Sequence, residues 1–205
     1  STAQKRVIGK NILSAVKKSN KALPHPDLPI FIFVYPWFPN IKDRTLFRGV
    51  NAFAAYYTLH LFINPNSYTG DSLQQTVAHE WNHLVFYRHH IKQNYPLYTH
   101  MIMEGLAEIF REEIMGGDIS PWVSALTRKE AETKLKSFNP KQLARKGMKI
   151  YREVFFGSRK YKRWTGYSIG YWLAKEFRKL NPKLSWEEIV KTKPEDILKS
   201  VKNRA

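Results

Sequence analysis

The sequence contains no cysteine and no uninterrupted apolar run of the roughly 18 residues that a transmembrane helix needs. Without cysteine the chain has no disulfides, no thiolate ligands for a metal ion and no cysteine nucleophile. The most apolar stretch, residues 29–38, is too short to span a bilayer and carries prolines toward both ends. It predicts a buried strand and no membrane segment.

Acidic residues are scarce: 17 Asp and Glu stand against 34 Lys and Arg, which gives a formal net charge of +17. This balance favours an acidic partner, namely nucleic acid, an anionic surface or an acidic polypeptide, although a solvated lysine-rich surface has the same composition. The densest basic stretch is SRKYKRW at 158–164, where aromatic residues interleave with cations. The sequence contains no recognised nucleic-acid motif beside it, so the class of acidic partner stays open.

The N-terminal residues, STAQKRVIGKNILSAVKK, lack the apolar core of a signal peptide, and the sequence begins with Ser and not with Met. We expect a soluble protein and favour export through an upstream signal outside this sequence, with a cytoplasmic location as the alternative. The oligomeric state has no signal in the sequence.

The length of 205 residues suits a single domain, with possible sublobes at 1–92 and 93–205. Strands placed before a run of helices indicate the α+β class, with a small N-terminal mixed sheet and a mostly helical C-terminal half. The expected elements, in order, are a helix at 4–19, strand signals at 30–35 and 52–65, and helices at 72–90, 100–115, from 120, at 140–156, at 165–180, from 186 and from 194.

The chemistry centres on the pattern H-E-x-x-H, which here reads His79-Glu80-Trp81-Asn82-His83. Ser72 and Gln75 match a capping box, which predicts that the pattern lies in the middle of a helix. Residues four apart share a helix face, so His79 and His83 can direct their imidazoles at one Zn²⁺ ion. Glu80 lies about 100° further round the helix, where it can take a proton from bound water.

Five residues match such a pattern by chance easily, so a third ligand has to be found. His89 occupies the place of the last histidine in H-E-x-x-H-x-x-G-x-x-H, but Phe86 replaces the glycine that lets the chain leave the helix. His100, beyond a loop, is another alternative. A third candidate for the ligand is Glu104, and its spacing from Glu108 makes it the one that we favour.

Glu104 and Glu108 are four residues apart on a predicted helix whose neighbouring side chains are apolar. Two like charges at this spacing repel each other, and partial burial increases the cost. A bound cation removes the conflict. We therefore expect Glu104 to bind zinc and Glu108 to orient a ligating histidine, with a solvated polar stripe as the alternative.

Taken together, the motifs resemble the gluzincin metallopeptidases, in which two histidines and a downstream glutamate bind zinc. The pattern at 79–83 is followed, twenty residues later, by E-G-x-x-E at 104–108. This second segment resembles one in the YjaZ-like group of uncharacterised bacterial predicted zinc proteases, and it is similar to one in the M1-type aminopeptidases. The resemblance covers about 50–180.

The resemblance implies roles for two further parts of the chain. A tyrosine on an apolar helix is often a core residue, but the aminopeptidases place their catalytic tyrosine in Y-x-x-G at a spacing similar to that of Tyr167, 63 residues beyond Glu104 (167 − 104). Such a tyrosine stabilises the oxyanion of a tetrahedral intermediate. In the thermolysin-like branch an edge strand containing Asn-Ala-Phe pairs with the substrate, which implies substrate binding by Asn51, Ala52 and Phe53.

The sequence thus predicts a zinc-dependent peptidase that hydrolyses internal bonds of a peptide or protein. It lacks the G-x-M-E-N segment of the aminopeptidases and the calcium-binding carboxylates of thermolysin-like proteins. Two alternatives stay open. One is an aminopeptidase. The other is a zinc-stabilised binding protein without catalytic activity, whose basic face engages nucleic acid or an anionic surface.

Overall fold

The computed structural model describes residues 1–25, 29–38, 40, 45–90 and 94–203. The chain forms two compact units, the first comprising Ser1–His89 and Phe110–Asp118 and the second His90–Ile109 and Ile119–Ala205. Helix α4, Leu97–Met115, contributes its first turns to the second unit and its last turns to the first. The secondary structure is of the α+β class, with one small sheet and mostly helices.

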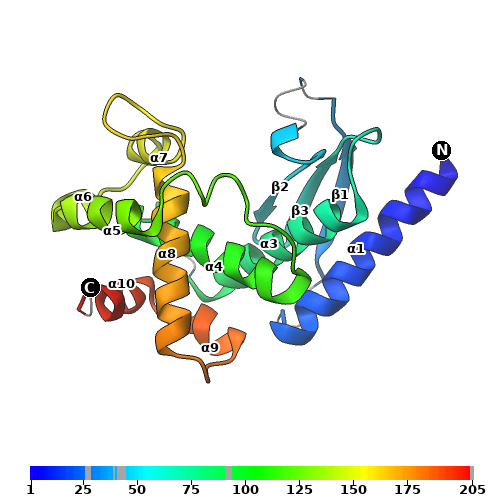
Figure 1. The fold of residues 1–205 in the computed structure, drawn as a ribbon. Coiled ribbons are helices and arrows are strands. Elements are labelled where there is room, and N and C mark those ends of the chain that lie inside the picture. The colour runs from blue at the N-terminus through cyan, green and yellow to red at the C-terminus, as the bar shows by residue number, and fades with distance from the viewer. Residues whose placement is uncertain (26–28, 39, 41–44, 91–93, 204–205) are drawn as a thin grey trace. The chain divides into compact units, whose positions relative to one another are not determined.

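The first unit contains a three-stranded mixed sheet in the order β1-β3-β2 (Figure 1). Strand β1, Phe31–Pro36, pairs parallel with β3, Thr58–Ile63, and β2, Val50–Ala55, pairs antiparallel with β3. Among the described residues β2 pairs only with β3, so it is an edge strand.

The prediction of one strand signal over 52–65 was too coarse, because the structure has a hairpin there. The chain turns between β2 and β3 at Tyr56, which has a left-handed φ of +43°. Such turns usually carry Gly, Asn or Asp, and here a tyrosine takes the place. The pattern therefore contains no sign of the break.

Side chains of β3 alternate between a buried and a half-buried face, as the geometry of a strand requires. Those of β1 are mostly exposed, so the prediction of a buried strand at 29–38 was wrong. Leu59, Leu61 and Ile63 of β3 are buried. On the other face the ring of His60 lies between those of Phe53 and Phe33, stacked at centroid distances of 4.5 and 5.0 Å. Helix α3, Gly70–His89, packs against β2 and β3, and α1, Thr2–Ala22, packs against α3.

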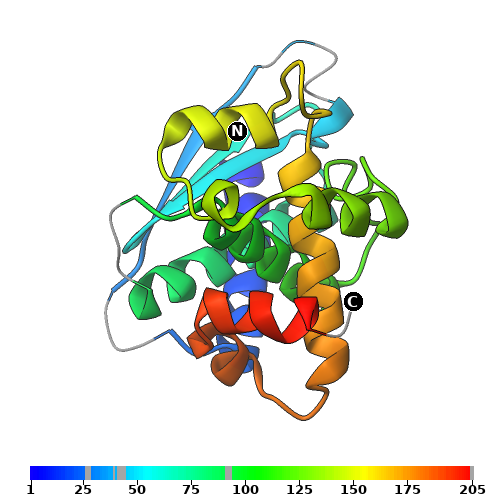
Figure 2. The ribbon, with the colours of Figure 1, turned by 90° about the vertical axis from the view of Figure 1, so that its left-hand side faces the viewer.

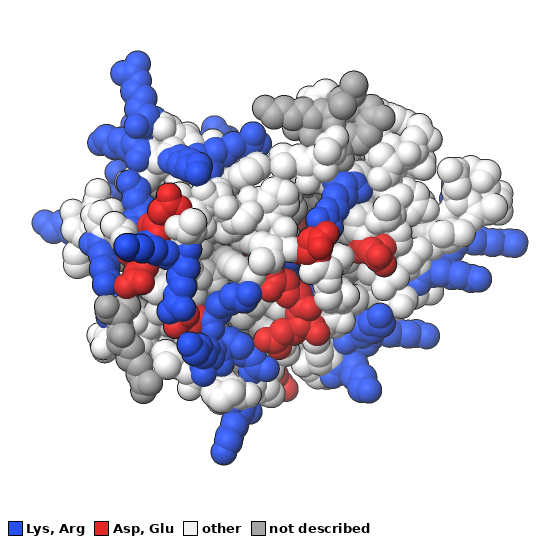
Figure 3. All heavy atoms as spheres, viewed as in Figure 1, with Lys and Arg blue, Asp and Glu red and all other residues white. Residues whose placement is uncertain are grey.

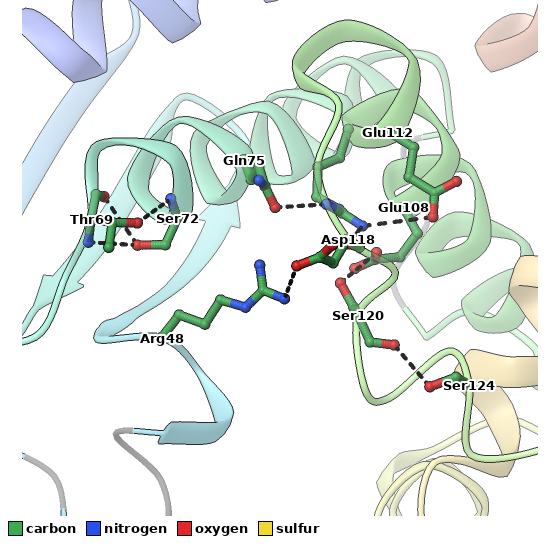
Figure 4. A network of polar contacts seen from close by, with 10 residues as sticks. Arg48, Thr69, Ser72, Gln75, Glu108, Glu112, Asp118, Ser120 and Ser124 are labelled. Carbon is green, nitrogen blue, oxygen red and sulfur yellow. Dashed lines mark hydrogen bonds and ion pairs between the residues drawn. The ribbon is translucent and has the colours of Figure 1, made fainter.

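Helix α3 begins earlier than predicted, and with a different cap. The backbone N–H of Ser72 donates to Oγ1 of Thr69 at 3.0 Å, and the backbone N–H of Thr69 donates to Oγ of Ser72 at 3.0 Å (Figure 4). Ser72 therefore lies inside the first turn, and the box of Ser72 with Gln75 was wrong. The Thr69 hydroxyl caps a backbone N–H group in the first turn of α3, which has no partner within the helix. Ser72 donates no such cap but accepts from the backbone N–H of Thr69, the role that a glutamate or glutamine usually has in a capping box.

We expect Thr69→Ala to lower the free energy of unfolding by about 1 kcal/mol, because the first turn of α3 loses its side-chain cap. Urea denaturation of the two proteins measures this difference. Thr133→Ala is the matched control, since Thr133 lies exposed inside a helix. An equal loss in both variants would show that Thr69 does not cap α3.

The second unit is built around α8, Thr165–Leu180 (Figure 2). Helices α5, Arg128–Ser137, α7, Met148–Phe155, and α10, Pro194–Lys202, all pack against it. The short helix α9, Trp186–Lys191, begins with the capping box of Ser185 and Glu188 that its sequence indicates.

Two predicted helices of this unit were wrong. No helix begins at Ser120; turns and bends follow it, and α5 starts only at the capping box of Thr127 and Glu130. The helix expected at 140–156 is two helices, α6, Pro140–Leu143, and α7. The break lies at Gly147, whose φ of +97° cannot continue a right-handed helix.

The surface in Figure 3 carries Lys and Arg side chains spread over the face in view, with acidic side chains among them. They do not gather there into one continuous basic patch. No helix in the described part of the chain is both long and apolar enough to cross a membrane.

Candidate metal centre

Two imidazoles of α3 converge on one point. The Nε2 atoms of His79 and His83 lie 3.0 Å apart, and the two rings are nearly perpendicular at an interplanar angle of 84°. Two nitrogens bound tetrahedrally to one zinc ion, each at 2.0–2.1 Å, are about 3.3 Å apart. The spacing of the histidines therefore fits a shared metal ion.

The direction of this face follows from how α3 packs in the first unit. Trp81 is buried, and its indole Nε1 donates a hydrogen bond to the backbone oxygen of Leu23 at 2.9 Å. Leu23 is the C-cap residue that directly follows α1. Trp81 lies about 200° round the helix from His79, so anchoring Trp81 beside α1 turns the two histidines to the opposite side.

Glu104 of α4 completes a group of three possible metal ligands. One ligand atom from each of His79, His83 and Glu104 lies within 4.8 Å of the others. His83 and Glu104 are buried, with 5% and 8% of their surfaces exposed. Two imidazoles and one carboxylate are a donor set typical of catalytic zinc sites. The residues therefore fit a zinc ion.

Neither alternative ligand belongs to this group. In the part of the chain that the structure describes, no metal-ligand cluster contains His89 or His100. His89 is the last residue of α3, which continues through Phe86 without a bend out of the helix. The pKa of His100 is lowered by burial, and the negative charge of Glu104 opposes this shift.

Glu80 follows His79 on α3, and only 6% of its surface is exposed. The helix turns it away from the line of His79 and His83 by about 100° per residue. A buried carboxylate in this position is protected from bulk water while it remains next to the first histidine. The placement is compatible with the base that the pattern predicts, but its role stays a prediction.

Glu108, one turn beyond Glu104, is completely buried. Its two oxygens accept hydrogen bonds from Oγ of Ser120 at 2.9 Å and from Nε1 of Trp122 at 2.8 Å. Both donors lie in the segment between α4 and α5, and Figure 4 shows Ser120 beside Glu108. A carboxylate with these two donors is held in one orientation, which is what a residue supporting a ligand requires. Its effect on a histidine stays a prediction.

Arg111 is a buried charge that no motif in the sequence marks. Its Nη1 donates to Oε1 of Gln75 at 2.8 Å, and its Nη2 donates to the backbone oxygen of Asp118 at 3.1 Å. Gln75 lies one turn before His79 on α3. The contact therefore ties the end of α4 to the histidine-bearing face of α3. No short pattern reveals such a pair, because its partners are 36 residues apart.

Tyr167 lies in the first turn of α8, and its side chain is half-buried. The rings of Tyr167 and Phe155 pack edge to face, with their centroids 4.9 Å apart. Phe155 stacks in turn on Tyr151, which contacts the ring of His100. A row of three rings, those of Phe155, Tyr151 and His100, thus extends from the tyrosine within the second unit. Its predicted role at the oxyanion is untested.

The three residues predicted to bind substrate all belong to the edge strand β2. The backbone N–H of Ala52 donates to Oδ1 of Asn51 at 2.9 Å, and 48% of the surface of Phe53 is exposed. An edge strand has unpaired backbone groups that an extended peptide can use. The position suits the prediction, and peptide binding is untested.

The basic segment 158–164 uses some of its cations within the second unit. Nζ of Lys162 donates to the backbone oxygen of Ala125 at 2.7 Å, and the guanidinium of Arg163 lies 4.5 Å from the ring centroid of Trp164. Intramolecular contacts thus account for part of the interleaved pattern. An acidic partner remains a prediction.

Comparison with known proteins places these features in a family. The chain matches the family described as "Predicted Zn-dependent protease (DUF2268)" over residues 8–199. It is 27% identical over 146 residues to the "Uncharacterized protein YjfC" of Bacillus subtilis (strain 168), a match that covers 64% of this chain and 46% of YjfC. The chain thus spans about half the length of that relative. No solved structure matches. With a match that extends over nearly the whole sequence, the protein belongs to this family of predicted Zn-dependent proteases.

Proposed function

We propose that the protein is a zinc-dependent peptidase of gluzincin type that cleaves internal bonds of a peptide or protein substrate. The observation that carries the proposal is the convergence of His79, His83 and Glu104 in a chain whose family is predicted to be Zn-dependent. Three protein ligands of this kind leave a fourth position for water, which distinguishes catalytic from structural zinc sites.

Zinc bound here would act as a Lewis acid, lowering the pKa of a water molecule and polarising the scissile carbonyl. Glu80 takes the proton that the water gives up and passes it to the nitrogen of the leaving amine. Its place directly after His79 supports this assignment, because a general base has to lie within reach of the water from which it takes a proton.

Tyr167 is proposed to donate a hydrogen bond from its phenol to the oxyanion that forms as the carbonyl is attacked. Glu108 supports the ligand set from its buried, doubly hydrogen-bonded position. The substrate backbone adds to the edge of β2 beside Asn51, Ala52 and Phe53, which holds it extended. The reason for proposing an endopeptidase is that the sequence lacks the G-x-M-E-N segment of the aminopeptidases.

We expect purified protein to contain one zinc ion per chain and to cleave an internally quenched peptide library. A chelator should abolish cleavage, and one equivalent of zinc should restore it. Zinc at 100 times its Kd should stabilise the fold by about 2.7 kcal/mol, because the ion binds the folded chain. Elemental analysis, the cleavage assay and denaturation with and without zinc measure these effects.

The outcomes separate the peptidase from its alternatives. Removal of single residues from peptide N-termini, with no internal cleavage, would point to an aminopeptidase. Stoichiometric zinc without any cleavage would favour a zinc-stabilised binding protein, and the absence of zinc would refute the proposal.

A further inference from the structure

Within the second unit, helices α4 and α8 touch backbone to backbone at a pair of glycines. A Cβ atom placed on Gly105 would lie 2.0 Å from the backbone oxygen of Gly170. A Cβ atom placed on Gly170 would lie 1.8 Å from the backbone oxygen of Met101, one turn before Gly105 on α4. The two helices are therefore closer than any residue with a side chain allows.

The atoms that block a side chain at these positions belong to the backbone. No rotamer change can move the oxygens of Gly170 or Met101 away. An alanine at Gly105 would have to push the helices apart by at least 1 Å, from 2.0 Å to the 3.0 Å below which real Cβ contacts are essentially never found. At Gly170 the required separation is larger, because the contact is shorter.

Each glycine of this contact lies close along its helix to a residue of the proposed site. Gly105 directly follows Glu104 on α4, and Gly170 lies one turn after Tyr167 on α8. Each residue belongs to the same rigid helix as its neighbouring glycine. The distance between the two helix axes at the glycine pair therefore sets how far the Glu104 backbone lies from the Tyr167 backbone.

A third glycine, Gly166, lies in the first turn of α8 and packs closely against a side chain of α7. A Cβ atom on Gly166 would lie 2.6 Å from the ring of Phe155, the ring that meets Tyr167 edge to face. Here the obstacle is a side chain, which can tilt. Gly166 thus gives Phe155 the space to support Tyr167, and a substitution there would disturb the tyrosine without separating the helices.

We propose that Gly105 and Gly170 are positioning residues, whose contact sets the distance between the zinc ligand Glu104 and the oxyanion donor Tyr167, and that Gly166 orients Tyr167 through Phe155. The inference rests on the proposed function. It also gives a physical reason for a glycine in both E-G-x-x-E and Y-x-x-G, since the two glycines are the two sides of one contact. A misplacement of 1 Å can lower a rate on the order of 100-fold, so the helix spacing matters to catalysis.

The test compares Gly105→Ala, Gly170→Ala and Gly166→Ala with the control Gly9→Ala, each in the full chain with zinc. Gly9 lies in α1 with nothing within 4 Å of an added Cβ, so its variant changes only helix propensity. We expect kcat to fall on the order of 100-fold in Gly170→Ala, with KM nearly unchanged. Zinc affinity should fall about 10-fold or more in Gly105→Ala, because Glu104 moves with it. Gly9→Ala should match the wild type.

A double-mutant cycle with Tyr167→Phe separates positioning from general damage. If Gly170 acts through Tyr167, Gly170→Ala should cost less than about 3-fold once the phenol is gone, because residues that act as a unit are not additive. Equal costs in both backgrounds would overturn the inference. Should the two helix-crossing variants not fold, the same cycle is run with Gly166→Ala, where the obstructing ring can move; additivity there would also overturn it.

The inference and the proposed function fail in different ways. A wild type that binds no zinc or cleaves no peptide refutes the proposed function. A wild type that binds zinc and cleaves peptide, while the Gly105 and Gly170 variants behave like Gly9→Ala, refutes the inference alone.

Discussion

Replacing Glu80 by glutamine should abolish peptide cleavage while the protein keeps its zinc. Glutamine has the same shape as glutamate, so the buried position stays filled, and Glu80 is not one of the three proposed zinc ligands. Glutamine cannot accept and release a proton at neutral pH. General acid–base catalysis contributes roughly 10²–10⁴-fold, so kcat should fall by at least that range. The quenched-peptide assay measures the rate, and elemental analysis measures zinc.

Glu113→Gln is the matched control, because Glu113 is an exposed carboxylate on α4. It should leave both rate and zinc content unchanged. If Glu80→Gln retained full activity, the proton would have to be carried by another group. If the variant lost zinc as well as activity, Glu80 would be acting on the metal ion and not on water.

Replacing Glu104 by alanine should weaken zinc binding more than about 100-fold, since even residues that only support a ligand typically cost 10–100-fold. Cleavage should disappear with the metal ion. Titration of metal-free protein with zinc against a competing chelator measures the affinity, and circular dichroism shows that the helices remain.

His89→Ala and His100→Ala are the matched controls for this second prediction. Both residues were alternative third ligands, and neither belongs to the metal-ligand group found among the described residues. Both variants should bind zinc as the wild type does. Loss of zinc in one of them, with full zinc retained in Glu104→Ala, would identify that histidine as the third ligand.

Several features of the fold could be predicted because their causes are local. Helix α8 follows from an unbroken apolar pattern, and α9 follows from the capping box of Ser185 and Glu188. Other features were missed because the residues at the turn or the helix start are unusual there, or match two positions equally well. Tyr56 makes a turn without the usual turn residues, and Ser72 matches a helix cap although Thr69 takes that role.

The same division applies to the candidate site. Spacing alone brings His79 and His83 to one face of α3, because four residues make slightly more than one helical turn. The expected repulsion between Glu104 and Glu108 led to the prediction of a cation beside Glu104, which stays a prediction. Sequence patterns could not reveal Ser120 and Trp122 as donors to Glu108, or Gln75 as the partner of Arg111.

The candidate ligands and the helix that carries two of them were therefore predictable from the residues alone, since each prediction depends on neighbours within a few turns. The support of Glu108, the tie between Arg111 and Gln75, and the contact of Gly105 with Gly170 depend on segments distant along the chain. A glycine is compatible with many environments, and a carboxylate with many donors. Their partners are chosen by packing, because only the folded backbone brings those atoms within contact distance.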